Sequence, residues 1–401
     1  MEKKVLKGKT MQIIENQAEL ESLCQVLKKQ KFVTIDSEFV REKTYFSKLC
    51  LLQVGWLDDA AIVDPLSNGL NLEPFFAIMQ DKNILKVFHS GRQDIEIFYN
   101  LSGKIPQPVF DTQIAAMVCG FGASVSYSTL VAEVTKVELD KSSRLTDWSK
   151  RPLDVKQLEY ALRDVTYLIP CYLYLDKYLK EHNREEWIKE EIAALCNEEI
   201  YKPDPESAWL KIRHSVHGAQ FLAVLKELAA WRERRAVKFN TPRHTIMKDD
   251  ILVNVAAVAP KTEADLYKVR NLPQDVQKGK LGREILEVVN KALNMPFSSE
   301  LQKIDRARQV HIPPAASALI EVLKLLLKIK SEQEGVVAHL IASEQDLRDI
   351  ACGNNDKTNP ALKGWRYDIF GKTALLFRKG KASIKYDTGI KDIVIAEATD
   401  R

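Results

Sequence analysis

Alternating apolar and polar residues predict a β-strand at Lys31–Val40, which reads KFVTIDSEFV and is rich in β-branched side chains. Three further short apolar runs are typical of buried strands: Leu49–Val54, Ala60–Val63 and Ile84–His89. Helical periods lie between and after these runs, for example at Ile114–Met117 and Val155–Leu175. Strands mixed with helices predict an α/β layer architecture for residues 11–200.

The hydrophobic pattern changes to an almost wholly helical one after Tyr201–Ser207, a segment with two prolines that we interpret as a linker. Long amphipathic stretches fill Trp209–Val237, Thr241-Pro242 interrupts them, and Pro313-Pro314 opens another helix. We therefore expect a first domain at 11–200, one helical domain at 207–293, a second at 312–380, and a weakly packed tail at 381–401.

The composition is that of a soluble folded protein. Of 401 residues, 45% are hydrophobic and 28% are charged, which excludes a mainly disordered chain or a collagen-like repeat. The six cysteines form no C-x-x-C pair, so we expect reduced thiols. No apolar run reaches the length of a membrane helix, and the N-terminus lacks the apolar core of a signal peptide. We expect a cytoplasmic location and no membrane partner.

Charge is distributed unevenly along the chain. Residues 1–200 carry 25 Lys+Arg against 30 Asp+Glu, a net of −5, whereas residues 201–401 carry 34 against 25, a net of +9. A basic half favours a polyanionic partner such as nucleic acid, although a solvated surface with a chance imbalance is an alternative. The acidic half would repel a phosphate substrate unless its carboxylates held metal ions.

The most informative residues are Asp36 and Glu38 in the alternating strand. Side chains two apart on a strand point to the same face, so these carboxylates are expected side by side. Like charges that close are unfavourable unless a cation neutralises them. A solvent-facing side of an edge strand is the alternative interpretation.

Two more acidic positions stand in helical contexts. Asp94 follows the strand at Ile84–Phe88 and opens a helix at Ile95–Tyr99, where it could simply compensate the helix dipole. Tyr160 and Asp164 are spaced i and i+4, which places both on one helical face. Either feature alone is common by chance.

Taken together, the four carboxylates predict a metal centre. Hydrolysis of a phosphodiester by two metal ions needs convergent oxygens that hold the ions ~3.5–4 Å apart. Carboxylates suit hard ions such as Mg²⁺ or Mn²⁺, so we expect two such ions as cofactors. Tyr160 could position the attacking water, because a phenol with a pKa of ~10 is not a free base at neutral pH.

The order of these motifs resembles the DEDD superfamily of 3′–5′ exonucleases, tyrosine subclass, and within it the ribonuclease D family most closely. The matching stretches cover most of residues 30–170: Ile35–Gly55, Ile62–Pro65, His89–Phe98, Pro108–Gly120 and Leu139–Pro170. The resemblance places the four acidic metal ligands of the family on Asp36, Glu38, Asp94 and Asp164, and its tyrosine on Tyr160. It implies a ribonuclease-H-like mixed sheet flanked by helices.

The helical half resembles HRDC domains, which are small helical nucleic-acid-binding modules. Leu228–Arg232, Asn240-Thr241-Pro242 and Asp249 carry this resemblance in the first module. The second module matches less well, in Ala318–Lys330 and Gly364-Trp365-Arg366, and the basic tail departs from the pattern. Two small all-α HRDC-type domains are thus expected after the exonuclease domain.

Three neighbours of the expected site have two interpretations each. Asp111 could support the site or cap a helix that starts at Thr112. Trp148 could stack on terminal nucleotides or wedge the entry of a helix. His89 at a strand end is interpreted as a structural residue, because the carboxylate set is already complete.

The resemblance implies a metal-dependent 3′–5′ exoribonuclease that releases nucleoside 5′-monophosphates. It would trim the 3′ ends of tRNA precursors and other small structured RNAs, and we expect a monomer with RNA as its partner. Two alternatives stay open from the sequence: an inert nucleic-acid-binding scaffold that keeps the fold, and a 3′–5′ exonuclease acting on DNA.

Overall fold

The computed structural model describes residues 13–140, 146–295, 313–389 and 391–397. Contacts between these residues divide them into two compact units. Unit 1 contains the described residues within 13–38, 50–140, 146–197, 313–389 and 391–397, and unit 2 contains residues 39–49 and 198–295. Each unit is described by itself.

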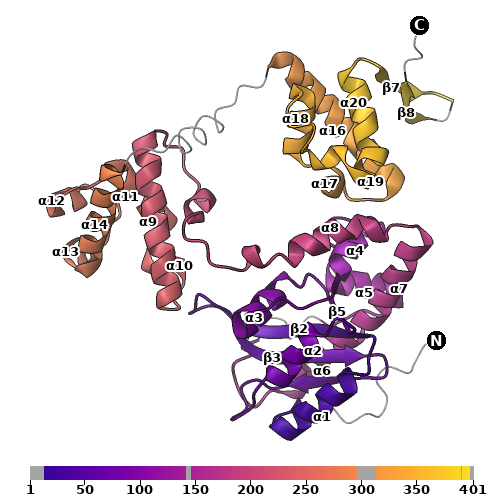
Figure 1. Ribbon diagram of the computed structural model, residues 1–401, viewed down its shortest axis with the longest axis horizontal. Helices are drawn as coiled ribbons and strands as arrows, with labels where there is room; N and C mark the ends of the chain where they lie inside the picture. The colour runs from indigo at the N-terminus through magenta and orange to yellow at the C-terminus, as the bar shows by residue number, and fades with distance from the viewer. Residues whose placement is uncertain (1–12, 141–145, 296–312, 390, 398–401) are drawn as a thin grey trace. The chain divides into compact units, whose positions relative to one another are not determined.

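A six-stranded mixed sheet lies in the N-terminal part of unit 1 (Figure 1). Its spatial order is β1-β4-β3-β2-β5-β6. The strands are β1 Ile13–Ile14, β2 Phe32–Val40, β3 Lys48–Trp56, β4 Asp59–Val63, β5 Leu85–Phe88 and β6 Val109–Asp111. β1 pairs with β4 in parallel, and β3 pairs with β4 antiparallel. β5 pairs in parallel with β2 on one side and with β6 on the other. The predicted strands are confirmed, whereas β1 and β6 are too short to show a period in the sequence.

Helices flank this sheet, which confirms the predicted α/β architecture. They are α1 Gln17–Leu27, α2 Glu73–Gln80, α3 Arg92–Ser102, α4 Thr112–Val118, α5 Tyr127–Thr135, α6 Val155–Thr166, α7 Leu168–Glu181 and α8 Glu185–Leu195. The helical run predicted from Val155 on is divided at Tyr167, which ends α6 and precedes α7. Pro170 explains the division, because proline has no N–H to donate to the carbonyl of Thr166 and its ring would clash there.

Helix α6 lies close against the sheet because small and polar groups meet there. The Thr34 hydroxyl on β2 donates to the backbone oxygen of Val165 at 2.8 Å. Gly55 on β3 faces the same contact, since a Cβ at this position would lie 2.5 Å from Thr34 Oγ1 and 3.1 Å from Val165 O. A capping box between Asp154 and Gln157 fixes the start of α6. The position of α6 over β2 and β3 is therefore closely constrained.

The C-terminal helical module belongs to unit 1. Its helices are α16 Pro314–Glu334, α17 Ala338–Ile341, α18 Glu344–Cys352, η3 Pro360–Leu362, α19 Gly364–Arg366, η4 Tyr367–Gly371 and α20 Lys372–Arg378. Pro313 precedes α16, as the sequence predicts. Leu323 and Leu326 of α16 share one apolar core with Leu168 and Leu175 of α7.

Polar and aromatic contacts add to this shared core. The rings of Trp187 on α8 and Trp365 on α19 stack with centroids 4.6 Å apart. Arg366, only 6% exposed, donates to the backbone oxygen of Leu340 and pairs with Glu190 and Glu191 of α8. The module and the sheet-containing part consequently form one folded body.

The tail is more ordered than the sequence indicates. It forms an antiparallel hairpin of β7 Ala382–Asp387 and β8 Asp392–Glu397. Ile395 packs against the shared core, while Lys385 and Tyr386 are exposed. None of the tail residues whose burial is described is buried, so the tail has regular structure and its weak packing stays a prediction.

Unit 2 is a helical bundle with its own apolar core. Its elements are η1 Glu198–Ile200, η2 Ala208–Lys211, α9 Ala219–Lys238, α10 Arg243–Ile246, α11 Asp249–Val258, α12 Glu263–Leu266, α13 Gln274–Lys278 and α14 Lys280–Asn294. Leu222, Leu225, Leu252 and Ile285 are fully buried in its core. Pro242 precedes α10, which confirms the predicted interruption after α9.

The loop between β2 and β3 is part of unit 2. The Tyr45 hydroxyl donates to Glu233 on α9, and Arg243 pairs with the same carboxylate. Asn240 accepts hydrogen bonds from the backbone N–H groups of Tyr45 and Phe46 at 3.0 Å each.

Within the described residues, no helix has both the length and the apolar character needed to cross a membrane.

We predict that Gly55→Ala lowers the free energy of unfolding by about 1–3 kcal/mol, because its methyl group would push α6 away from β2 and β3. Thermal or urea unfolding measures the effect. Gly389→Ala is the matched control, since its Cβ would meet only the flexible Asp387 carboxylate at 3.1 Å. Equal stability of Gly55→Ala and the parent protein would show that this contact does not constrain α6.

Candidate metal centre

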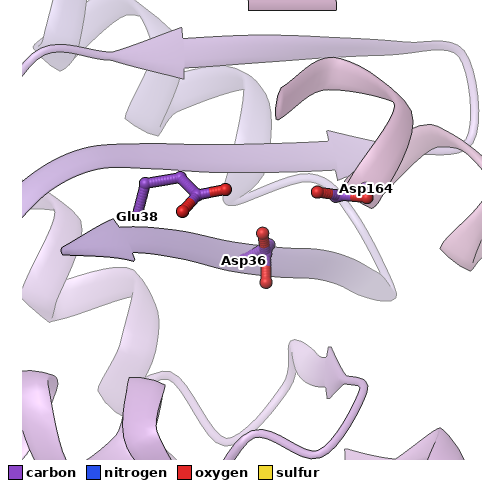
Figure 2. A group of neighbouring side chains, drawn as sticks. All are labelled: Asp36, Glu38 and Asp164. Carbon is purple, nitrogen blue, oxygen red and sulfur yellow. The ribbon is translucent and has the colours of Figure 1, made fainter. Parts of the chain in front are cut away.

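Three carboxylates from two elements meet on one face of the sheet. Asp36 and Glu38 project from β2, and Asp164 projects from α6 (Figure 2). One oxygen from each of these carboxylates lies within 4.8 Å of the others. The strand alternation predicted Asp36 and Glu38 on one face, and the structure adds Asp164 to them.

Asp94, on helix α3, lies beside this group and is held by a hydrogen bond from strand β2. It is buried in the first turn of α3, as predicted, and its Oδ1 accepts a hydrogen bond of 2.5 Å from the Ser37 hydroxyl. It does not belong to the three-carboxylate cluster, but its charge acts on Asp36. Ser37 therefore links β2 to α3 at the centre.

The proximity of these acids shifts their titration. Burial, followed by the charges of Asp164, Asp94 and Glu38, raises the pKa of Asp36 well above its usual range. Burial also raises the pKa of Asp94 to about 6, and that of Asp164 to about 7. A cation among these groups would favour their ionised forms and relieve the repulsion.

Tyr160 stands one turn before Asp164 on α6 and hydrogen-bonds to it. Burial raises the pKa of Tyr160 above its usual range, and the carboxylates of Asp164, Glu38 and Asp36 raise it further. The phenol is thus neutral at physiological pH and acts through hydrogen bonds. Trp148, which is 3% exposed, lies against it with ring centroids 6.1 Å apart.

Asp111 performs both roles that the sequence left open. Its carboxylate caps α4 by accepting from the N–H groups of Gln113 and Ile114 at 2.8 and 3.2 Å. It also accepts from the N–H groups of Ser90 and Gly91 at 3.1 and 2.8 Å. Those two residues lead into α3, so Asp111 also holds the turn that precedes Asp94.

His89 is a structural residue, in agreement with the sequence interpretation. Its Nδ1 lies 2.9 Å from the Thr112 hydroxyl, and its ring contacts Tyr127 with centroids 5.5 Å apart. Burial lowers the pKa of His89, which keeps the ring neutral. Tyr127 in turn donates to the backbone oxygen of Arg163 on α6 at 2.8 Å.

An ion pair that the sequence did not suggest holds the segment before α6. The Arg151 guanidinium donates to both oxygens of Asp64 at 2.6 and 2.7 Å. It also donates to the backbone oxygen of Trp148 at 2.8 Å. Arg151 and Asp64 are 87 residues apart, so no local pattern in the sequence indicates that they pair. Of these residues, only Trp148 was named from the sequence as a neighbour of the site. The wedge interpretation of Trp148 is consistent with its burial.

The donor set fits a hard divalent cation. All candidate ligands are carboxylate oxygens, the ligand type that Mg²⁺ and Mn²⁺ prefer. No histidine or cysteine belongs to the cluster found among the described residues. The raised pKa values indicate that the negative charge there lacks a balancing cation from the chain itself. The centre is suited to metal-assisted attack on a phosphodiester.

Two family models match the chain. A 3′–5′ exonuclease model matches residues 11–180, and an HRDC domain model matches residues 221–289. The HRDC match lies in the first helical module, so one HRDC domain is shown and the second stays a prediction.

The relatives agree with these models over nearly the whole chain. The ribonuclease D of Bartonella henselae is 42% identical over 382 residues, covering 95% of this chain and 93% of that protein. The ribonuclease D of Jannaschia sp. is 44% identical and covers 91% of this chain and 95% of its own. The crystal structure of Escherichia coli RNase D, described as an exoribonuclease involved in structured RNA processing, is 27% identical. The superposition covers 92% of this chain and 99% of the Escherichia coli chain, with a TM-score of 0.76. The chain therefore belongs to the ribonuclease D family of 3′–5′ exoribonucleases.

Proposed function

We propose that this exoribonuclease trims the 3′ ends of tRNA precursors and other small structured RNAs, releasing nucleoside 5′-monophosphates one at a time. The observation that carries the proposal is the convergence of Asp36, Glu38 and Asp164 from β2 and α6, with Asp94 beside Asp36. The relatives' shared name supports the choice of RNA.

Each acidic residue has a proposed place in the centre. Asp36, Glu38 and Asp164 would hold one divalent ion, and Asp36 together with Asp94 would hold a second. Two such ions, Mg²⁺ or Mn²⁺, supply activation of water and neutralisation of charge at the leaving 3′ oxygen. The hydrogen bond from the Ser37 hydroxyl to Oδ1 orients the Asp94 carboxylate.

Tyr160 would position the attacking water, which assigns the chain to the tyrosine subclass. A neutral phenol can donate one hydrogen bond and accept another, and Asp164 already fixes its orientation. Trp148 limits the rotation of the ring, and Arg151 and Asp64 hold Trp148 in place.

The helical domains would supply RNA affinity. The C-terminal half carries the net charge of +9 that the sequence shows, and its lysines and arginines suit phosphate contacts. We assign the C-terminal module as a second HRDC-type domain because its α16, α18 and α20 also enclose an apolar core. All six cysteines are free, which suits a reducing cytoplasm, and we propose that the enzyme acts there as a monomer.

The proposal is tested with a 5′-labelled RNA that carries a 3′ extension beyond a tRNA sequence. Mg²⁺ should give a ladder that shortens in single-nucleotide steps, and EDTA should stop it. A matched DNA strand should be degraded more slowly. Binding of the RNA without metal-dependent shortening would instead support the inert scaffold, and faster cleavage of DNA would support a DNA exonuclease.

We predict that Asp36→Ala reduces the turnover rate by about 10³-fold or more, because loss of the shared carboxylate removes several kcal/mol of transition-state stabilisation. The fold should stay intact, since the change also relieves carboxylate repulsion. Initial rates on the labelled RNA measure the loss. Glu186→Ala, which removes a surface acid on α8, should leave the rate unchanged. An Asp36→Ala variant with the full rate would exclude the proposed centre.

Tyr160→Phe should lower the turnover rate by about 10²-fold and leave metal binding nearly unchanged, because it removes a hydrogen bond and no metal ligand. Calorimetric titration with MnCl₂ separates the two effects. A loss of metal affinity as large as the loss of rate would contradict a role in positioning water.

The metal-free protein should lose stability as pH rises from about 4 to about 7. An unfolded aspartate has a pKa of ~3.9, whereas Asp94 and Asp164 titrate at about 6 and about 7 when folded. The folded state therefore retains protons in this window, and its stability falls as they are released. Melting temperatures in EDTA across this window should fall more for the parent protein than for Asp164→Asn. Parallel curves would contradict the raised pKa of Asp164.

A further inference from the structure

Gln53 is a fully buried glutamine in the middle of strand β3. Its neighbours Leu51, Leu52 and Val54 are apolar and also fully buried. Neither its amide nitrogen nor its amide oxygen has a hydrogen-bond partner in the structure. A buried polar group without a partner destabilises a fold by about 1–3 kcal/mol, so this side chain calls for an explanation.

The strand register shows which face Gln53 occupies. β2 and β3 are neighbours in the sheet and run in opposite directions (Figure 2). A Cβ at Gly55 would point at the Thr34 side chain, so positions 34 and 55 share a face. Because side chains alternate along a strand, Gln53 shares that face with Gly55, and Asp36 and Glu38 share it with Thr34. Gln53 therefore lies on the face of the metal centre, in the strand next to Asp36.

Helix α6 packs against this same face of the sheet. Val165 contacts both Thr34 and the Gly55 position, and α6 also carries Tyr160 and Asp164. Thr34 donates to Val165 O, and Tyr160 bonds to Asp164, whereas Thr166 Oγ1 and Trp148 Nε1 each lack a partner. Gln53 differs from them because both ends of its amide lack a partner.

Metal-binding carboxylates usually accept a hydrogen bond from a second residue that fixes their orientation. Asp94 has such a partner in Ser37, and Asp164 has one in Tyr160. For Asp36, a backbone hydrogen bond with Ser37 acts to lower its pKa. The amide of Gln53, two N–H donors on the adjacent strand, is the group placed to orient this shared carboxylate.

We propose that Gln53 is a positioning residue of the metal centre, whose amide N–H donates to the Asp36 carboxylate when divalent ions are bound. This inference rests on the proposed function, because it requires Asp36 to be a metal ligand.

The test compares Gln53→Met, which keeps the length of the side chain and removes both polar functions, with Leu52→Met. Leu52 is fully buried on the opposite face of β3, so its variant controls for repacking of the strand. Melting temperature in EDTA, affinity for MnCl₂ by calorimetry, and turnover on the labelled RNA are measured for all three proteins.

We expect Gln53→Met to melt in EDTA at or above the temperature of the parent protein, because an unpaired buried amide is removed. Its affinity for Mn²⁺ should fall by about 10–100-fold, with a matching fall in turnover. Leu52→Met should bind Mn²⁺ as the parent protein does. The opposite signs of the two effects distinguish positioning from a purely structural role.

Two results would overturn the inference. Failure of Gln53→Met to fold, or a clear drop of its melting temperature in EDTA, would show that the amide already has a structural partner. Affinity for Mn²⁺ equal to that of the parent protein would show that the amide does not act on the centre. Failure of the parent protein itself to bind Mn²⁺ would contradict the proposed function as well. The parent protein's result therefore separates failure of the proposed function from failure of the inference about Gln53.

Discussion

Repulsion among half-buried carboxylates is the constraint on which the rest of this structure depends. Asp36, Glu38 and Asp164 are brought within a few ångströms by β2 and α6, and Asp94 stands beside them. Burial and mutual repulsion raise the pKa of Asp36 well above its usual range. The fold keeps this arrangement because the surrounding elements are fixed by contacts that do not involve the charges. A divalent cation converts the same repulsion into binding energy.

Those fixing contacts surround the centre on each side. Thr34 and the absent side chain of Gly55 let α6 approach β2 and β3 closely. Asp111 holds the turn before α3 by accepting from two N–H groups, and Ser37 ties Asp94 to β2. Each contact is a hydrogen bond or a tight approach of backbone, and such contacts tolerate little displacement. Rigidity of this kind keeps like charges together before metal arrives.

The C-terminal module extends the same body. Its α16 contributes Leu323 and Leu326 to the core that α7 forms with α4, and Arg366 bridges it to α8. Helix α7 follows directly after α6, which carries Tyr160 and Asp164, and the module packs against α7. Loss of this packing would loosen the support behind the catalytic helix. The basic half of the chain thus has a structural role besides the RNA affinity proposed for it.

The sequence by itself determined what depends on local period. Alternation in β2 placed Asp36 and Glu38 on one face, and the i, i+4 spacing placed Tyr160 with Asp164 on one side of α6. The resemblance of the motifs to a known family then supplied the expectation that Asp94 joins them. Only the tertiary structure decided that Ser37 binds Asp94, that Arg151 pairs with Asp64, and that Gln53 is buried without a partner. The ordered tail and the shared core of α7 and α16 belong to the same group. These contacts join residues from separate strands and helices, so no periodic pattern in the chain records them.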